Sequence, residues 1–238
     1  MKNLLPCLFL IVISFFTACV GENGNGHVTK EDRKVEAFTK IENKGIFKVQ
    51  LKQGNSPAVL VETDENLQKL VTTTIENGTL VLGTKSGVTI HHSTEMNVYI
   101  TVNNLQSFYN DGVGEVISDG TLNLTTLEFK NKGVGKTKLA INCKFLEAEL
   151  TGVGATTLSG TVDSAIIKND GVGNLNAYEL IVQKLKITNK GVGNADVHAE
   201  KTIELKNNGV WNINYKGNAT VLKMENEGVG KVNKKDEN

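Results

Sequence analysis

Hydrophobic and polar positions alternate in each copy of a repeat that is marked by the signature Gly-Val-Gly. The first glycine of the successive copies is Gly112, Gly133, Gly152, Gly171, Gly191, Gly209 and Gly228, at spacings of 21, 19, 19, 20, 18 and 19 residues. Four residues earlier stand Phe108, Phe129, Ala148, Ile167, Ile187, Leu205 and Met224, and the position six residues earlier is also mostly apolar. The residues between them are mostly charged or polar, so each copy predicts a strand with one buried face.

A second short strand is predicted after each signature. Its inward position is occupied by Val116, Thr137, Thr156, Leu175, Ala195, Ile213 and Val232. Two or three short strands in about 19 residues make one coil of a solenoid, in which each strand pairs with its counterpart in the next coil, about 4.8 Å away. The pattern therefore predicts an all-β fold, a parallel β-helix with coils of about 19 residues.

Asparagine recurs two residues before the first glycine of the signature. It is present in six of the seven copies, as Asn110, Asn131, Asn169, Asn189, Asn207 and Asn226, and Leu150 is the exception. Amide side chains at one position of successive coils can donate to each other's carbonyls, so a polar residue can be buried with its hydrogen bonds made. We expect these residues to form a structural ladder inside the solenoid.

The seven glycines suit a corner of the coil, where a positive φ or a close approach of two backbones is needed. The residues between the glycine positions are Val113, Val134, Val153, Val172, Val192, Val210 and Val229. If the strand runs straight through, these valines form an exposed stripe that could bind a partner or a second copy. If the glycines bend the chain and shift its phase, the valines fill an inner corner. We expect the corner, because glycine pairs commonly mark such bends.

Residues 35–104 show the same pattern less regularly. The segment from Ile41 to Phe47 repeats it without the second glycine, and further strands are predicted near Val59 and Val61, from Leu67 to Ile75, and at Leu80 and Leu82. This part is expected to be an irregular N-terminal cap that covers the exposed end of the stack.

The N-terminus has the features of an export signal. Lys2 precedes an almost wholly apolar stretch that is too short to span a bilayer. Phe16-Thr17-Ala18-Cys19 resembles a lipobox, so residues 1–18 are expected to be a signal peptide and Cys19 the lipidated residue, with ordinary cleavage near Ala18 as the alternative. Residues 19–34 then hold the lipidated cysteine and a flexible tether, 35–233 a single β-helix domain, and 234–238 a polar tail.

Charge and cysteine content exclude several partners. The chain has 26 basic and 26 acidic residues, so no basic surface for nucleic acid is expected. Once Cys7 leaves with the signal and Cys19 is lipidated, Cys143 remains alone, and we expect a small buried residue. No metal or other cofactor is predicted. His91, His92 and Glu95 lie close together, but adjacent histidines on a strand point to opposite faces.

The chain resembles a known family at this point. Gly45-Ile46-Phe47-Lys48-Val49, a strand segment at residues 59–82, and the repeated Asn-x-Gly-Val-Gly are similar to the head GIN domain family of autotransporter-type adhesins in Bacteroidetes lipoproteins. The likeness covers nearly all of residues 35–232. It implies a right-handed parallel β-helix, displayed at the outer membrane on its surface or in the periplasm, and a role in adhesion. The family brings no catalytic residues.

Two functions of different classes follow. The first is a non-catalytic envelope lipoprotein that binds glycan or protein, or forms homo-oligomers, with Trp211, which replaces the second glycine of its copy, as a possible binding aromatic. The second is a carbohydrate-active enzyme on the same scaffold, which would need convergent acids or bases in a cleft. Asp111 and Asp170 share one repeat position, but other residue types fill it elsewhere, so we expect a solvated face and no enzyme.

Overall fold

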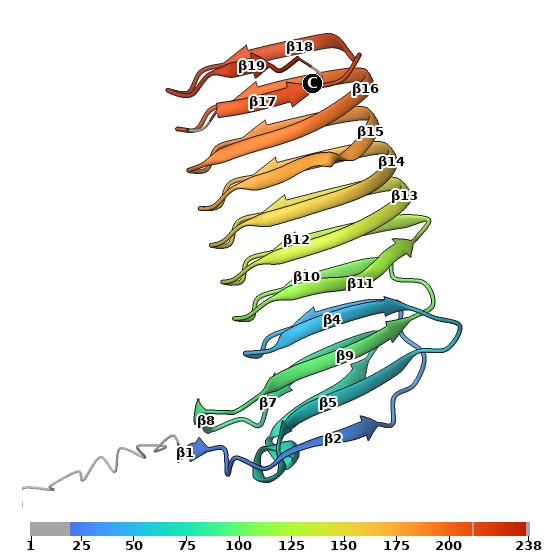
Figure 1. Ribbon diagram of the computed structural model, residues 1–238, viewed down its shortest axis with the longest axis vertical. Coiled ribbons are helices and arrows are strands. Elements are labelled where there is room, and N and C mark those ends of the chain that lie inside the picture. The colour runs from blue at the N-terminus through green and yellow to red at the C-terminus, as the bar shows by residue number, and fades with distance from the viewer. Residues whose placement is uncertain (1–19, 211, 237–238) are drawn as a thin grey trace, which may run out of the picture.

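The computed structural model describes residues 20–210 and 212–236, so the expectations for Cys19 and Trp211 lie outside the described residues. The chain forms a tall column of stacked strands with the C-terminus at one end and the first strands at the other (Figure 1). The predicted all-β parallel β-helix is confirmed. Among the described residues no helix has the length and apolar character of a membrane span.

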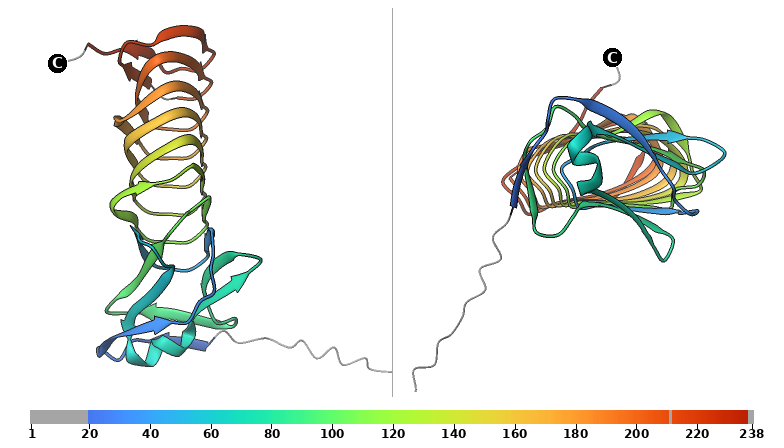
Figure 2. Two further views of the ribbon diagram at one scale, coloured as in Figure 1. Left: turned by 90° about the vertical axis from the view of Figure 1, so that its right-hand side faces the viewer. Right: turned by 90° about the horizontal axis from the view of Figure 1, so that it is seen from below.

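Each regular coil has two flat faces. Face A contains the strands that precede the signature: β10 (Ser107–Asn110), β12 (Thr126–Asn131), the second halves of β13 (Thr137–Leu150), β14 (Thr156–Asn169), β15 (Leu175–Asn189) and β16 (Asn194–Asn207), and β18 (Thr220–Asn226). Face B contains the strands that follow it: β11 (Val116–Asn123), the first halves of β13 to β16, β17 (Asn212–Lys216) and β19 (Val232–Lys234). The flattened outline of the coils is clear in the end-on view (Figure 2).

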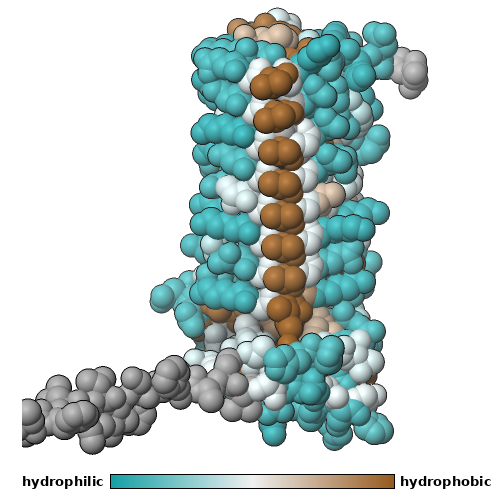
Figure 3. Space-filling view, turned by 90° about the vertical axis from the view of Figure 1, so that its left-hand side faces the viewer, coloured by the Kyte–Doolittle hydropathy of each residue, from teal (hydrophilic) through white to brown (hydrophobic). Residues whose placement is uncertain are grey.

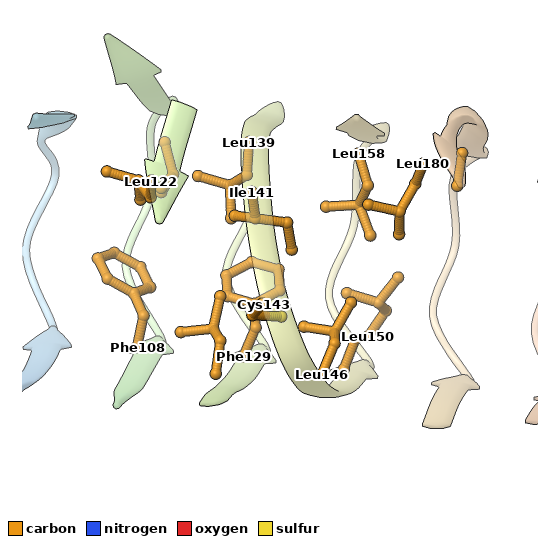
Figure 4. Packing of buried hydrophobic residues seen from close by; sticks show 14 of the residues in the cluster. Phe108, Leu122, Phe129, Leu139, Ile141, Cys143, Leu146, Leu150, Leu158 and Leu180 are labelled. Atoms are coloured by element: carbon orange, nitrogen blue, oxygen red, sulfur yellow. The ribbon is translucent and has the colours of Figure 1, made fainter. Parts of the chain in front are cut away.

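The coils stack in parallel and in register, which brings equivalent inward positions together. Leu127 pairs with Leu146, and Ala165 pairs with Leu185 in the same column. The rings of Phe108 and Phe129 lie 6.0 Å apart inside the column, between the two faces (Figure 4). The apolar interior is therefore continuous from coil to coil, although no single coil could bury it.

The chain does not build the column in sequence order. The first coil consists of β3 (Lys40–Asn43) and β4 (Lys48–Gln53), and it lies between β7 (Thr79–Thr84) and β9 (Met96–Val102) on one side and β10 and β11 on the other. The chain thus leaves the first coil, builds the cap beneath it, and returns past it to begin the regular stack.

The cap is built mainly from antiparallel pairs of strands. β5 (Ala58–Asp64) pairs with β9 and with β2 (Val28–Arg33), and β6 (Val71–Glu76) forms a hairpin with β7. The hairpin turns at Asn77 and Gly78, which both have positive φ, 51° and 73°, as a tight two-residue turn requires. Residues 65–70 form a 3₁₀ helix, η1 (Glu65–Leu70), so the prediction of a strand beginning at Leu67 was wrong there.

The prediction of a flexible tether before residue 35 was also wrong for the described part. β1 (Val20–Asn23) pairs with β8 (Val88–His92), and β2 pairs with β5 over its whole length. The buried carboxylate of Asp64 accepts hydrogen bonds from the Gly26 backbone N–H and from the Thr94 backbone and hydroxyl. Although burial acts in the opposite direction, these donors hold the pKa of Asp64 below its usual value. The segment is part of the cap.

Candidate interaction surface at the glycine-valine corner

The Gly-Val-Gly segments form one edge of the column, where face A meets face B. Each valine N–H donates to the carbonyl of a glycine one coil earlier, as from Val134 to Gly112 and from Val153 to Gly133, both at 3.0 Å. Val113, Val134, Val153, Val172 and Val192 pair in turn as parallel bridges. The corner is therefore a continuous hydrogen-bonded ladder that holds its side chains in a fixed row.

Both glycines of the signature are required by the backbone. A Cβ on Gly152 would lie 2.2 Å from the Gly133 carbonyl oxygen, because consecutive coils approach closely at this point. The second glycine also has positive φ, 133° at Gly154, where other residues are strained. The interior of the corner is thus occupied by bare backbone.

The valines point outward, so the expectation of an inner corner was wrong. Val113, Val134, Val153, Val172 and Val192 are each between 48% and 52% exposed, and Val210 is 64% exposed. The strand parity runs straight through the signature: the glycines take the inward positions and the valine between them takes the outward one. Ile46 occupies the equivalent position in the first coil and is 41% exposed. We call the row from Ile46 through Val229 the valine stripe.

The valine stripe is a single apolar column between polar side chains on the face that Figure 3 shows. From Ile46 to Val210 it spans seven coils, or about 30 Å at about 4.8 Å per coil. Continuous apolar patches of this kind on a soluble face mark interaction sites far more often than scattered apolar residues do.

A buried asparagine ladder lies behind the stripe. The side chains of Asn43, Asn110 and Asn131 form one run, with Nδ2 to Oδ1 distances of 2.8 Å. Leu150 interrupts the ladder, and Asn131 instead faces the Thr137 hydroxyl at 3.5 Å.

The ladder resumes beyond this break. The second run is Asn169, Asn189, Asn207 and Asn226, joined at 3.1, 3.1 and 3.0 Å. All six asparagines singled out in the sequence belong to these two runs. Asn43 is an additional member, which the first coil hides because Phe47 replaces its second glycine.

The valine stripe is flanked by two rows of polar side chains. The row on face A, one residue before the signature, contains Lys44, Asp111, Lys132, Thr151, Asp170, Lys190, Asn208 and Glu227. The row on face B, one residue after the signature, contains Lys48, Glu115, Lys136, Ala155, Asn174, Asn194, Asn212 and Lys231. The two rows therefore border the apolar column along its whole length.

Several of the charges on the rest of face A are paired with each other. Lys130 contacts Glu128 at 2.6 Å, and Lys168 contacts Glu147 at 3.2 Å. Glu225 lies between Lys223 and Lys206, and their hydrogen bonds lower its pKa to about 2. Such exposed pairs add little stability, but they leave these carboxylates occupied by a lysine of the same chain.

Among the charges beside the stripe, Lys44 pairs with Glu42 at 3.0 Å and Lys48 pairs with Glu115 at 3.5 Å. Within the described residues, Asp111, Asp170 and Lys190 make no ion pair, and Lys132 contacts only the face of the Tyr109 ring, at 5.4 Å. These four charges beside the apolar column are therefore available to a partner.

The candidates for catalysis or metal binding do not converge. A groove of 110 Å³ on face A is lined by Glu204 and Glu225, but each of these carboxylates is paired with a lysine. In the described part of the chain no group of three or more metal-binding side chains is placed to hold an ion. His91, His92 and Glu95 are exposed in the cap. Asp111 and Asp170 are exposed and lie three coils apart along the corner.

Cys143 lies in the core, where the sequence placed it. Its side chain is 8% exposed, and burial raises the pKa of the thiol to about 11. At neutral pH it is protonated and unreactive.

A two-faced parallel β-helix with a regular apolar edge defines a class of solenoid that presents repeated surface rows. The chain belongs to the family described as putative auto-transporter adhesin, head GIN domain, whose model matches residues 37–219. The resemblance seen in the sequence is thereby confirmed. None of the curated proteins matches the chain.

Solved structures share the fold over nearly the whole chain. A crystal structure of a putative adhesin from Bacteroides fragilis is 26% identical, with a TM-score of 0.87, and the alignment covers 90% of this chain and 100% of that one. A putative adhesin from Parabacteroides merdae is 22% identical, with a TM-score of 0.68 and coverage of 91% and 100%. A putative lipid binding protein from Parabacteroides distasonis is also 22% identical, with a TM-score of 0.73 and the same coverage.

Proposed function

We propose that this protein is a non-catalytic binding module of the cell envelope, held to the outer membrane through lipidated Cys19, and that it acts as an adhesin. The observation that carries the proposal is the valine stripe. Seven side chains that are about half exposed offer on the order of 500 Å² of apolar surface in one strip, which is the size of an interaction patch.

The construction of the stripe supports a binding role over a structural one. The valine side chains contribute little to the core because they point away from it, and the glycines and asparagines behind them hold the corner in place. A rigid row loses little entropy on binding, which favours affinity. An apolar strip bordered by polar rows has the layout of a protein interface, with an apolar centre and a polar rim. We therefore infer a protein ligand in preference to a glycan.

An adhesion assay tests this proposal. Beads coated with residues 20–238 through an N-terminal biotin are incubated with bacterial cells and counted on them by microscopy. We expect the double variant Val134→Lys and Val172→Lys to lose adhesion, because two charges interrupt the stripe without touching the core. The control is Lys138→Asp, an exposed change on face B away from the stripe. Equal adhesion by the stripe variant and the control would reject the stripe as the binding surface.

The same protein tests the absence of catalysis, and labelling of the full chain in cells tests the anchor. Incubation with a panel of polysaccharides should leave their chain length unchanged, and the release of shortened sugars would establish an enzyme instead. Trp211→Ala in this panel tests whether that aromatic binds glycan. In cells, labelling with a fatty-acid analogue should mark the wild type and not Cys19→Ser; equal labelling of both would reject the anchor.

A further inference from the structure

We propose that the partner of the valine stripe is the stripe of a second copy of this chain, packed antiparallel about a two-fold axis that passes through Val153. The proposal rests on the adhesin function above and names its ligand. The proposal is carried by the order of charges in the row beside the stripe. When this row meets the same row of a second copy in the opposite direction, one register places opposite charges against each other.

The apolar contacts define the register. With the axis at Val153, this valine faces its own copy, Val134 faces Val172, and Val113 faces Val192. Ile46 then faces Val210, so seven coils of each chain take part. Each contact occurs twice, as a two-fold interface requires.

The charged row on face A meets the same row of the second copy in reverse order. Lys132 then faces Asp170, and Asp111 faces Lys190, which gives four ion pairs by symmetry. Thr151 lies on the axis and faces itself. None of these four side chains has an ion pair within the described residues, and the second copy supplies one for each.

The row on face B is compatible with the same register. Lys136 faces Asn174, Glu115 faces Asn194, and Ala155 lies on the axis. No two like charges meet in this row, and the amide groups can accept or donate as their neighbour requires.

Other arrangements bring like charges together. Sliding the second copy by one coil, so that the axis moves half a coil toward the C-terminal end, places Lys132 opposite Lys190. Sliding it by one coil the other way places Asp111 opposite Asp170, and moving the axis by a full coil in either direction places Asp170 or Lys132 opposite its own copy. A parallel pairing about an axis along the stripe places Lys132 opposite Lys136 of the same coil. The antiparallel register at Val153 avoids all of these, and like-charge contacts are what select one arrangement over another.

The area involved predicts a weak contact. Two stripes of on the order of 500 Å² bury about 1,000 Å² in total, the lower bound of specific protein interfaces. A single pair of molecules should therefore associate reversibly. Many lipid-anchored copies on two surfaces would adhere strongly, because each further contact is intramolecular.

The antiparallel arrangement also places the two anchors at opposite ends. The N-terminal cap lies at one end of the column and β18 and β19 lie at the other (Figure 1). Two antiparallel columns therefore send their N-termini to opposite poles, which suits molecules on two facing membranes. The structure thus points to self-adhesion between surfaces that carry this protein.

Sedimentation equilibrium of residues 20–238, which include every described strand, tests the register through charge reversal. We expect Lys132→Asp and Asp170→Lys each to weaken self-association about tenfold, because each places two like-charge pairs at the interface. An equal mixture of the two variants should recover the wild-type strength, since each chain then meets opposite charges. Lys138→Asp is the matched control, and circular dichroism verifies folding.

Cross-linking tests the orientation. With a short bismaleimide, Val153→Cys should cross-link to itself, Val113→Cys should not, and a mixture of Val113→Cys and Val192→Cys should. The buried Cys143 thiol does not compete. A chain that stays monomeric at millimolar concentration, a mixture that fails to recover association, or self-cross-linking by Val113→Cys would each overturn the proposal. If coated beads then still adhere to cells that lack this protein, the adhesin function stands with another ligand.

Discussion

The asparagine ladder should contribute measurably to stability, and Asn189 is the rung on which to test it. Its side chain is fully buried, donates to Asn207 Oδ1 and accepts from Asn169 Nδ2, both at 3.1 Å. In Asn189→Ala the Asn169 amide keeps no acceptor among the described residues. A buried donor without an acceptor costs about 1 to 3 kcal/mol, and the cavity left by the removed side chain adds to this cost. We expect the free energy of unfolding to fall by about 2 to 4 kcal/mol.

Two further variants separate the causes. Asn189→Leu keeps the side-chain volume but makes no hydrogen bond, and Leu150 shows that this repeat position can hold a buried leucine. The free energy of unfolding of Asn189→Leu should still fall by about 1 to 3 kcal/mol. Asn208→Ala removes an exposed hydrogen bond to Glu227 of 2.6 Å and should change stability by less than about 0.5 kcal/mol. Stability is measured by urea unfolding and by hydrogen exchange in β14 and β16. The reasoning fails if Asn189→Ala costs no more than Asn208→Ala.

Three further predictions concern the corner and the core. Gly154→Ala should prevent stable folding, because its Cβ would lie 1.9 Å from the Gly135 carbonyl oxygen at a φ of 133°. Gly120→Ala has open space around its Cβ and should cost only about 1 kcal/mol. Equal melting temperatures of the two variants would contradict this. Because the pKa of Cys143 is raised to about 11, the folded chain holds the thiol proton at pH values where the unfolded chain has lost it. The free energy of unfolding should therefore decline from about pH 9 to about pH 11 more steeply in the wild type than in Cys143→Ala. Parallel curves for the two proteins would argue against this. Ellman's reagent at pH 8 should react with Cys143 only after denaturation, and rapid reaction of the native chain would show that the thiol is accessible.

The solenoid could be predicted from the sequence because its interior residues recur with one short repeat length. Apolar residues recur four and six positions before the signature, and their side chains are buried at the expected places, as at Phe129 and Leu146. The last coil departs from this at a β-bulge: Val221, and not Leu222, pairs with the inward Ile203, and Leu222 is 61% exposed.

The direction of the valines could not be settled by the same rule, because a glycine has no side chain to show which way its position points. In the structure the backbones of consecutive coils meet at the inward positions of the corner. A Cβ on Gly133 would lie 2.2 Å from the carbonyl oxygen of Gly112 in the preceding coil. Strand parity therefore continues through the signature, and Val134 takes the outward side. The alternation in the sequence already favoured outward valines, but bends at glycine pairs are common, and a bend would have turned the valines inward.

The first strands were missed for a different reason. β2 lies at the edge of the cap and is largely exposed on both faces, so its sequence shows no alternation of apolar and polar residues. Its partner β5 lies about thirty residues later in the chain, and Asp64 fixes the loop before β2 through a buried carboxylate that reads in sequence as an ordinary surface residue. Long-range pairing of this kind leaves no local signal.

The most direct test of the central claim is whether the valine stripe becomes buried when the protein adheres. Val172→Cys is labelled with a polarity-sensitive fluorophore, and its emission is compared between dilute protein and protein-coated beads attached to cells. We expect a shift to shorter wavelength on attachment, and no shift for the same label at Lys138→Cys on face B. Adhesion with an unchanged emission at Val172→Cys would show that the stripe stays in water and that another surface binds.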